Sequence, residues 1–189
     1  TWILKNPGST YTGATTISGG VLGVDKLSNG GVASSIGASL GTAGNLSIGN
    51  GGTLRYTGTG DSTDRLFTLQ TGTTSIESSG TGAIVFSNTG DVVLQTANTA
   101  RTVSLGGTNT GLNIMGGRIT NAGTGVTSLV KNGPGNWVLT GNNTFTGNTT
   151  INDGTLVLAK TGGAVGLASA NIAIGGASGS DQLQLGVAN

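Results

Sequence analysis

The sequence contains no cysteine, no histidine and only two prolines among its 189 residues. Without these side chains, serine–histidine triads, thiol nucleophiles and zinc sites built on cysteine or histidine are excluded within it. A disulfide framework is excluded for the same reason. The lack of cysteine suits an exported protein that does not depend on disulfides, although many cytosolic proteins also lack it.

Charge is equally scarce, because charged residues make up 8% of the chain and the net charge is +1. An ordinary domain has about 25% charged residues. The eight basic residues stand singly and far apart, so no cluster is available to neutralise phosphates, which argues against a nucleic-acid partner. No run of 18 apolar residues occurs, and we therefore expect no membrane insertion within this segment.

Glycine is abundant instead, with 38 residues, and it separates short apolar segments together with Thr, Ser and Asn. Collagen is excluded because glycine has no three-residue period and proline is nearly absent. Disorder is disfavoured because Leu, Ile, Val and Phe exceed the level typical of disordered chains and the net charge is small. No stretch of ten residues has helical spacing without glycine, so we expect an all-β protein with almost no helix.

The expected strands are short, alternate in polarity and lie between turn-rich segments. Alternation predicts that Leu46, Ile48, Leu54 and Tyr56 point inward. Residues 28–42 are predicted to form a loop anchored by Ile36 and Leu40. The expected strand segments are 2–4, 15–17, 21–24, 45–48, 53–56, 65–69, 73–76, 83–86, 91–94, 101–105, 111–115, 127–130, 137–139, 149–151, 155–158, 171–174 and 182–185.

An internal repeat organises these segments. Residues 2–26 recur as residues 137–160: Tyr11-Thr-Gly matches Phe145-Thr-Gly at an offset of 145 − 11 = 134, and Lys26 matches Lys160 at the same offset. A repeat of this kind is typical of solenoids and other repeat architectures. We interpret residues 1–189 as one continuous β-solenoid segment, with one large repeat unit over 1–135 and the start of the next over 136–189. Because both ends fall within a motif, we expect an excerpt of a longer protein.

Short strands could also form a β-sandwich, but its strands usually run to five residues or more with regular hairpin turns. A parallel β-helix fits better, with coils of roughly 20 residues stacked about 4.8 Å apart and eight or nine coils in all. The predicted core is the inward Leu, Ile and Val ladder together with Trp2, Phe67, Phe86, Trp137 and Phe145. We also expect the two motif copies to lie on equivalent faces, with Trp2, Leu4, Ile17 and Leu22 inward like Trp137, Leu139, Ile151 and Leu156.

The repeat carries a family resemblance. Residues 135–156 read GNWVLTGNNTFTGNTTINDGTL and resemble the autotransporter-associated β-strand repeat of large bacterial surface proteins. The first copy departs from the pattern at Lys5-Asn-Pro-Gly8, which predicts a remodelled turn there. The resemblance implies a right-handed β-helix, export, a location outside the cell or on the bacterial outer surface, and membership of a passenger region. It brings no catalytic residues.

Candidate sites are few. Asp61 and Asp64 are close in sequence and could suggest a carboxylate cluster or a calcium site, but we interpret them as a solvated loop with Asp64 beside Arg65. The Thr-x-Thr pairs at 10/12 and 144/146 recur too rarely for an ice-binding surface. Tyr11 and Phe145 could stack on sugar rings, although a role in closing a coil is favoured. We predict no catalytic, cofactor-binding or metal site and no cofactor.

Three functions stay open. The favoured one is a structural stalk of an exported bacterial surface protein, with further copies of the same repeat or chain as partners through end-to-end or lateral association. The second is an adhesin or glycan-binding module whose partners are surface glycans. The third is a polysaccharide-degrading β-helix enzyme, which is disfavoured because it needs a carboxylate cluster on one face. We therefore expect a non-enzymatic protein.

Overall fold

The computed structural model describes residues 1–159, 168–176 and 181–186, and it contains short strands in three sheets with one short 3₁₀ helix, η1 (Ala43–Asn45). All pairings between its strands are parallel. The members of each sheet are given below in sheet order.

Sheet A consists of eight strands: β1 (Trp2–Leu4), β3 (Gly20–Val24), β5 (Gly52–Tyr56), β8 (Gly72–Ser78), β11 (Arg101–Gly106), β13 (Thr127–Lys131), β15 (Thr149–Ile151) and β17 (Ile172–Ile174). Sheet B consists of four: β10 (Val93–Leu94), β7 (Thr68–Leu69), β4 (Leu46–Ile48) and β2 (Thr15–Ile17). Sheet C consists of six: β18 (Gln182–Leu185), β16 (Thr155–Leu158), β14 (Asn136–Leu139), β12 (Asn113–Met115), β9 (Gly82–Phe86) and β6 (Thr59–Thr63).

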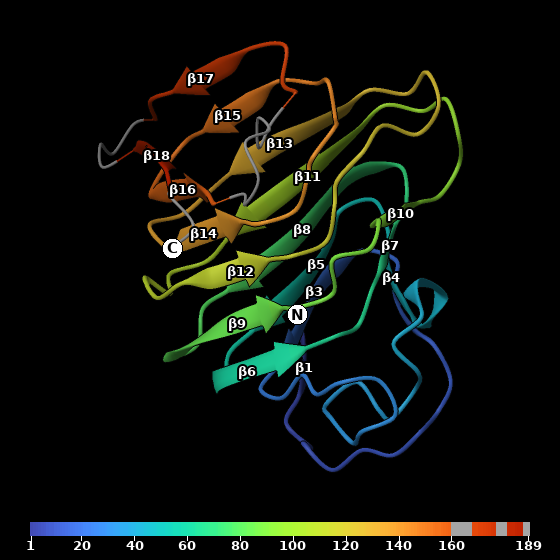
Figure 1. Cartoon of the computed structure of the whole chain (residues 1–189). Coiled ribbons are helices and arrows are strands. Elements are labelled where there is room, and N and C mark those ends of the chain that lie inside the picture. The colour runs from blue at the N-terminus through green and yellow to red at the C-terminus, as the bar shows by residue number, and fades with distance from the viewer. Residues whose placement is uncertain (160–167, 177–180, 187–189) are drawn as a thin grey trace.

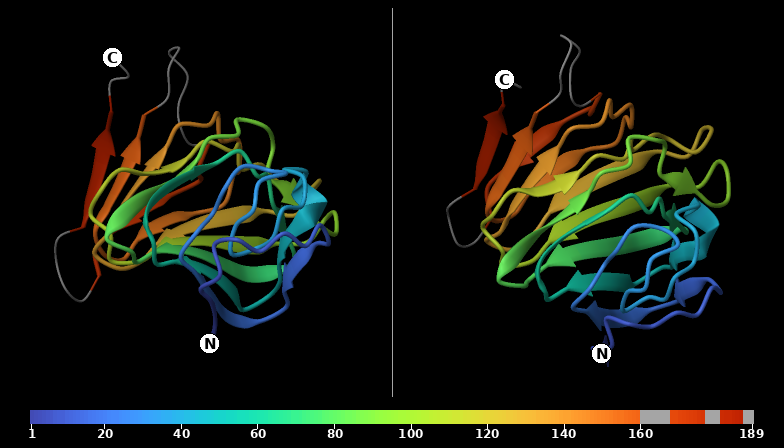
Figure 2. Two further views of the ribbon diagram at one scale, coloured as in Figure 1. Left: turned by 90° about the horizontal axis from the view of Figure 1, so that it is seen from below. Right: turned by 60° about the horizontal axis from the view of Figure 1, so that its bottom comes forward.

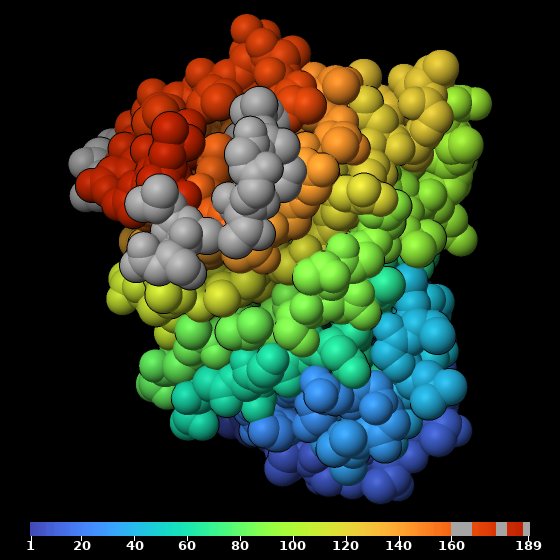
Figure 3. Space-filling view, viewed as in Figure 1, coloured from blue at the N-terminus to red at the C-terminus, as the bar shows by residue number. Residues whose placement is uncertain are grey.

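The chain passes from sheet A to sheet C, then to sheet B, and returns to sheet A beside its previous strand, as β5, β6, β7 and β8 show (Figure 1). The coils differ in length. Trp2 pairs with Leu22 after 22 − 2 = 20 residues, whereas Leu22 pairs with Leu54 after 54 − 22 = 32 residues. The views in Figure 2 show the strands stacked one above another, and in Figure 3 the colours follow one another in chain order from the N-terminal coils upward. The predicted parallel β-helix is confirmed.

Rows of apolar side chains fill the interior because the parallel register places equivalent positions above one another. In sheet A the row contains Leu54, Ile76 and Leu105. In sheet C, Phe86 pairs with Met115, and the row continues through Leu139 and Leu158. Phe67 packs edge-on against Phe86 with ring centroids 5.5 Å apart. Of the five aromatic residues expected in the core, Phe67, Phe86, Trp137 and Phe145 are buried.

The motif copies do not lie on equivalent faces, and that prediction was wrong. Trp2 lies on β1 in sheet A, whereas Trp137 lies on β14 in sheet C. The Trp–Leu pairing within each copy is nevertheless the same, because Trp2 pairs with Leu22 and Trp137 with Leu156. Between the two copies the chain completes five coils, from β1 to β13 in sheet A. It then continues to sheet C, where the second copy begins on β14. The second copy is therefore displaced by one face around the coil.

The end position of β1 explains a second difference. Trp2 lies in the inward-facing row, but its side chain is 79% exposed because the described structure has no strand on the other edge of β1. Leu4 is also exposed, whereas the corresponding Trp137 and Leu139 lie between two neighbouring strands and are buried.

Residues 25–45, between β3 and β4, also depart in part from expectation. Ile36 anchors this segment as predicted, but Leu40 is 66% exposed. Asp61, which we expected in a solvated loop, lies instead on β6 (residues 59–63) at the edge of sheet C. No helix in the described part of the chain is long and apolar enough to cross a membrane. Lys160, one of the matched repeat positions, lies outside the described residues.

Candidate functional site

Asp61 and Asp64, the acidic pair considered in the sequence analysis, make separate contacts. Asp61 is not solvated: its carboxylate forms an ion pair with Lys26 and accepts hydrogen bonds from the Tyr56 hydroxyl and the Leu27 backbone N–H, both at 3.0 Å. Asp64 accepts a hydrogen bond from the Gly30 N–H at 2.7 Å. Both carboxylates therefore fasten residues 25–45 to the following coil. No group of three metal-ligating side chains is found among the residues that the structure describes.

The hydrogen bond between Tyr56 and Asp61 lies in an enclosed environment. Burial raises the pKa of the Tyr56 phenol to about 12, and the negative charge of Asp61 acts in the same direction. The same hydroxyl accepts a hydrogen bond from the Gly60 N–H at 2.8 Å. Sequence reasoning placed Tyr56 inward correctly, but it gave no indication of the carboxylate that meets it.

Arg65 lies inside the molecule, although the sequence suggested a surface partner of Asp64. Its guanidinium donates to the carbonyl of Ser28 at 3.0 Å, to the carbonyl of Ser39 at 2.7 Å and to the carbonyl of Gly37 at 3.2 Å. Burial lowers the pKa of this guanidinium. Arg65 therefore stabilises the segment between β3 and β4, which contains no strand, by hydrogen bonds to its backbone carbonyls.

Two further buried cations occupy comparable positions. Arg101 donates to carbonyls of two successive coils, including Leu69 at 2.9 Å and Gln95 at 2.8 Å. Lys131 lies in the apolar row of sheet A between Leu105 and Ile151. Its ammonium donates to three turn carbonyls: Asn132 at 3.0 Å, Gly133 at 2.6 Å and Asp153 at 3.0 Å.

Among the described residues, neither cation has a carboxylate within bonding distance. Burial lowers the pKa of both groups, to about 8 for Lys131. Alternation could have located them, because Arg101 and Lys131 share the parity of their inward neighbours Val103 and Leu129. The interior chemistry is therefore structural: these charges hold the turns of adjacent coils together.

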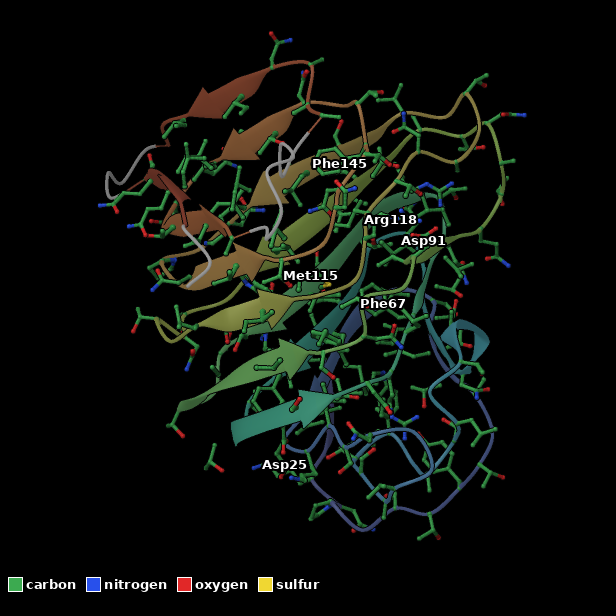
Figure 4. All side chains as sticks on the ribbon, in the orientation of Figure 1. Asp25, Phe67, Asp91, Met115, Arg118 and Phe145 are labelled. Atoms are coloured by element: carbon green, nitrogen blue, oxygen red, sulfur yellow. The ribbon has the colours of Figure 1, made fainter. Side chains whose placement is uncertain are left out.

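The aromatic position of the motif is also structural in the second copy. Phe145 is fully buried, as favoured from the sequence, and Figure 4 shows it within the coil stack together with Phe67 and Met115. In the first copy, Tyr11 is partly exposed and its hydroxyl lies 2.7 Å from that of Thr15. Figure 4 also shows Asp91 and Arg118 side by side on adjacent coils, where they form an exposed ion pair.

The outer face of sheet A has a different character. It is lined mainly by Thr, Ser, Val and Ala, and its outward charged side chains in the described strands are Arg55 and Glu77. These residues pair across adjacent strands, with Arg55 Nε 2.6 Å from a Glu77 carboxylate oxygen. A hollow of about 360 Å³ lies beside them, lined by Arg55, Glu77, Ser79, Gly106, Gly107, Thr108, Asn132, Gly133 and Pro134. This is the candidate binding surface, and the sequence gave no sign of it.

Comparison with known proteins agrees with the repeat seen in the structure. Residues 1–24 and 129–158 match the model of the passenger-associated transport repeat. The chain is 61% identical over 153 residues to a protein named adhesin BmaC autotransporter from Brucella suis biovar 1 (strain 1330). The match covers 81% of this chain but only 4% of that relative. No solved structure gives a significant match.

Proposed function

The repeat match and the 61% identity to an autotransporter over 81% of the chain place it in the family of autotransporter passenger repeats. On that premise we propose that it is a stalk segment of an exported bacterial surface protein. The matched relative is named an adhesin autotransporter, and the chain spans a small part of its length. In this proposal the segment holds other parts of its parent protein away from the outer surface and carries out no reaction.

The observation that carries the proposal is the continuity of sheet A. Its eight strands are joined in one parallel sheet that runs through both motif copies and through coils of unequal length. The hydrogen bonds between neighbouring strands run along the solenoid axis. All of them therefore act together against a force that pulls the coils apart. Loop insertions such as residues 25–45 leave this sheet unbroken. Such a solenoid is suited to bearing axial load and displaying neighbouring domains.

Association with further coils is the second part of the proposal. Side chains of the inward-facing row are exposed at both ends of sheet A. They belong to Trp2 and Leu4 on β1 and to Ile172 and Ile174 on β17. Exposed strand edges and apolar rungs favour pairing with another strand. A coil of the same kind, from the parent chain or from a second copy, presents the matching backbone spacing.

Sedimentation velocity over a concentration series tests this association. We expect the 189-residue protein to form larger species as concentration rises. Leu4→Lys places a charge in the exposed end row and should keep the protein monomeric, whereas Leu112→Lys, at an exposed position on the side of the coil stack, should not. A monomer at every concentration, or equal behaviour of both variants, would contradict end-to-end association.

An enzymatic function has no comparable support. Asp61 and Asp64 are the acidic residues closest to each other in the sequence. Asp61 contacts Lys26, Tyr56 and the Leu27 N–H, whereas Asp64 contacts the Gly30 N–H. A glycoside-cleaving site requires two carboxyl groups facing a common substrate. We therefore retain the non-enzymatic proposal. Incubating the protein with polysaccharides and measuring reducing ends should give the rate of a heat-inactivated control.

A further inference from the structure

We propose that the hollow beside Arg55 and Glu77 on the outer face of sheet A binds a segment of a neutral saccharide chain. This function would be separate from load bearing and does not depend on stalk assembly. The inference rests on the shape of the surface, on the hydrogen-bonding atoms that remain free there, and on its balance of charge.

The shape follows from glycine in an outward-facing row. Arg55 pairs with Gly23 on one side and with Glu77 on the other, and Glu77 pairs with Gly106. The absence of side chains at Gly23 and Gly106 opens a hollow on each side of the ion pair. The larger one has a volume of about 360 Å³, and a second one of about 240 Å³ is lined by Thr1, Ile3, Lys5, Gly23, Arg55 and Thr57. Arg55 borders both, so the two form neighbouring subsites.

The ion pair leaves hydrogen-bonding capacity unused. Arg55 contacts Glu77 through Nε, and its two terminal nitrogens have no partner among the described residues. One Glu77 carboxylate oxygen is used and the other is free in the same part of the structure. The side chains are 38% and 26% exposed, so these atoms are accessible to a ligand. Hydrogen bonds to charged groups are stronger than those between neutral groups.

The walls extend this polar surface along the solenoid axis. Ser79, Thr108 and Asn132 supply hydroxyl and amide groups around the larger hollow. Asn132 also accepts a hydrogen bond from Asn152 of the next coil at 2.9 Å. Because successive coils are about 4.8 Å apart, polar groups recur at regular intervals along the row. A polymer with regularly spaced hydroxyl groups can follow them.

Charge balance selects the ligand class. Arg55 and Glu77 neutralise each other in the larger hollow, which disfavours a phosphate or another strongly charged ligand. No aromatic side chain lines it, so an apolar peptide would find little surface to bury. Adjacent hydroxyl groups of a sugar can accept from Arg55 and donate to Glu77 at once, while the Pro134 ring offers a small apolar contact. The site is shallow, and we expect a dissociation constant of the order of 1 mM.

Saturation-transfer NMR on the whole protein tests the proposal, with maltohexaose, cellohexaose and chitohexaose as neutral probes and hexagalacturonate as an anionic probe. Gly106→Leu should abolish the signal or weaken binding at least tenfold, because the new side chain would fill the hollow. Gly106 does not have a positive φ, and an added Cβ would come no closer than 3.4 Å to Glu77 or Asn132, so folding should be kept. Thr102→Leu, on the same strand and face, is the matched control and should bind normally.

Glu77→Gln provides a second variant that keeps the shape of the site. It removes a charged acceptor and should weaken binding by about fivefold while thermal unfolding stays close to that of the parent protein. Binding of a neutral probe that is lost in Gly106→Leu and kept in Thr102→Leu supports the site. No binding of any neutral probe, binding of the anionic probe alone, or equal binding in both leucine variants would overturn it. Because the two leucine variants are compared at the same protein concentration, the outcome does not depend on end-to-end association.

Discussion

Lys131 offers the sharpest test of the interior. Its fully buried ammonium interrupts a row of aliphatic side chains and donates to the carbonyls of Asn132, Gly133 and Asp153. Burial lowers its pKa from 10.5 to about 8, against the opposing influence of the Asp153 and Asp181 carboxylates. The unfolded chain therefore binds this proton more tightly than the folded protein does, and folding stability must depend on pH in that range.

The sign of the dependence follows from proton linkage. Below pH 8 the lysine is protonated in both states, and the cost of burying the charge is fully present. Between pH 8 and 10.5 the unfolded state binds more protons, so the free energy of unfolding rises with pH. From these two pKa values the gain between pH 8 and pH 10 is about 2 kcal/mol. Tyr56 acts in the opposite direction only above about pH 10, because its pKa is raised from 10.0 to about 12.

Urea unfolding at fixed ionic strength, measured at half-unit steps from pH 7 to pH 10, is the assay. Lys131→Met is the matched variant, because methionine keeps an unbranched side chain without the titrating charge. We expect the parent protein to become more stable over this range and the slope to disappear in the variant. A flat or falling profile for the parent protein, or the same rising slope in Lys131→Met, would refute the reasoning about this buried ammonium.

The remaining predictions concern packing and metal dependence. Leu156→Ala should lower the free energy of unfolding by roughly 2–5 kcal/mol, since Leu156 is fully buried beside Trp137 of the neighbouring strand; a loss below about 0.5 kcal/mol in urea unfolding would show that it is not in the core. Trp137 should dominate the blue-shifted fluorescence, so Trp2→Phe should remove only red-shifted emission and Trp137→Phe the blue-shifted part; the reverse would contradict the burial pattern. The thermal midpoint should be the same with calcium and with a chelator, and a rise of several degrees with calcium would indicate a site at Asp61 or Asp64.

The sequence predicted the fold through its alternation. Short apolar–polar segments identified the strands, and parity placed Leu46, Ile48, Leu54 and Tyr56 inward, as the structure confirms. The two motif copies also have the same internal Trp–Leu pairing. These features are local, because they depend on a two-residue period and on one motif, so they can be read from a single sequence.

The features that could not be predicted from the sequence depend on the number of residues between strands, which sets how the coils are aligned. The face occupied by each motif copy reflects the accumulated path of five coils of unequal length, which no local pattern records. The roles of Asp61 and Arg65 arise because residues 25–45 fold back to meet them from more than 20 positions away. The hollow at Arg55 similarly needs side chains from several coils. Such features require the register, and the register is a property of the assembled solenoid.

Disulfide formation in paired cysteine variants tests the parallel coil register most directly, because the chain has no cysteine of its own. Val130 and Thr150 are neighbours on the outer face of sheet A, on strands about 4.8 Å apart, which suits a disulfide. Thr150 and Val157 lie in different sheets, A and C, but would come close if residues 149–158 formed a hairpin. The β-helix predicts oxidation of Val130→Cys with Thr150→Cys and free thiols in Thr150→Cys with Val157→Cys. Free thiols in the first variant and a disulfide in the second would contradict it.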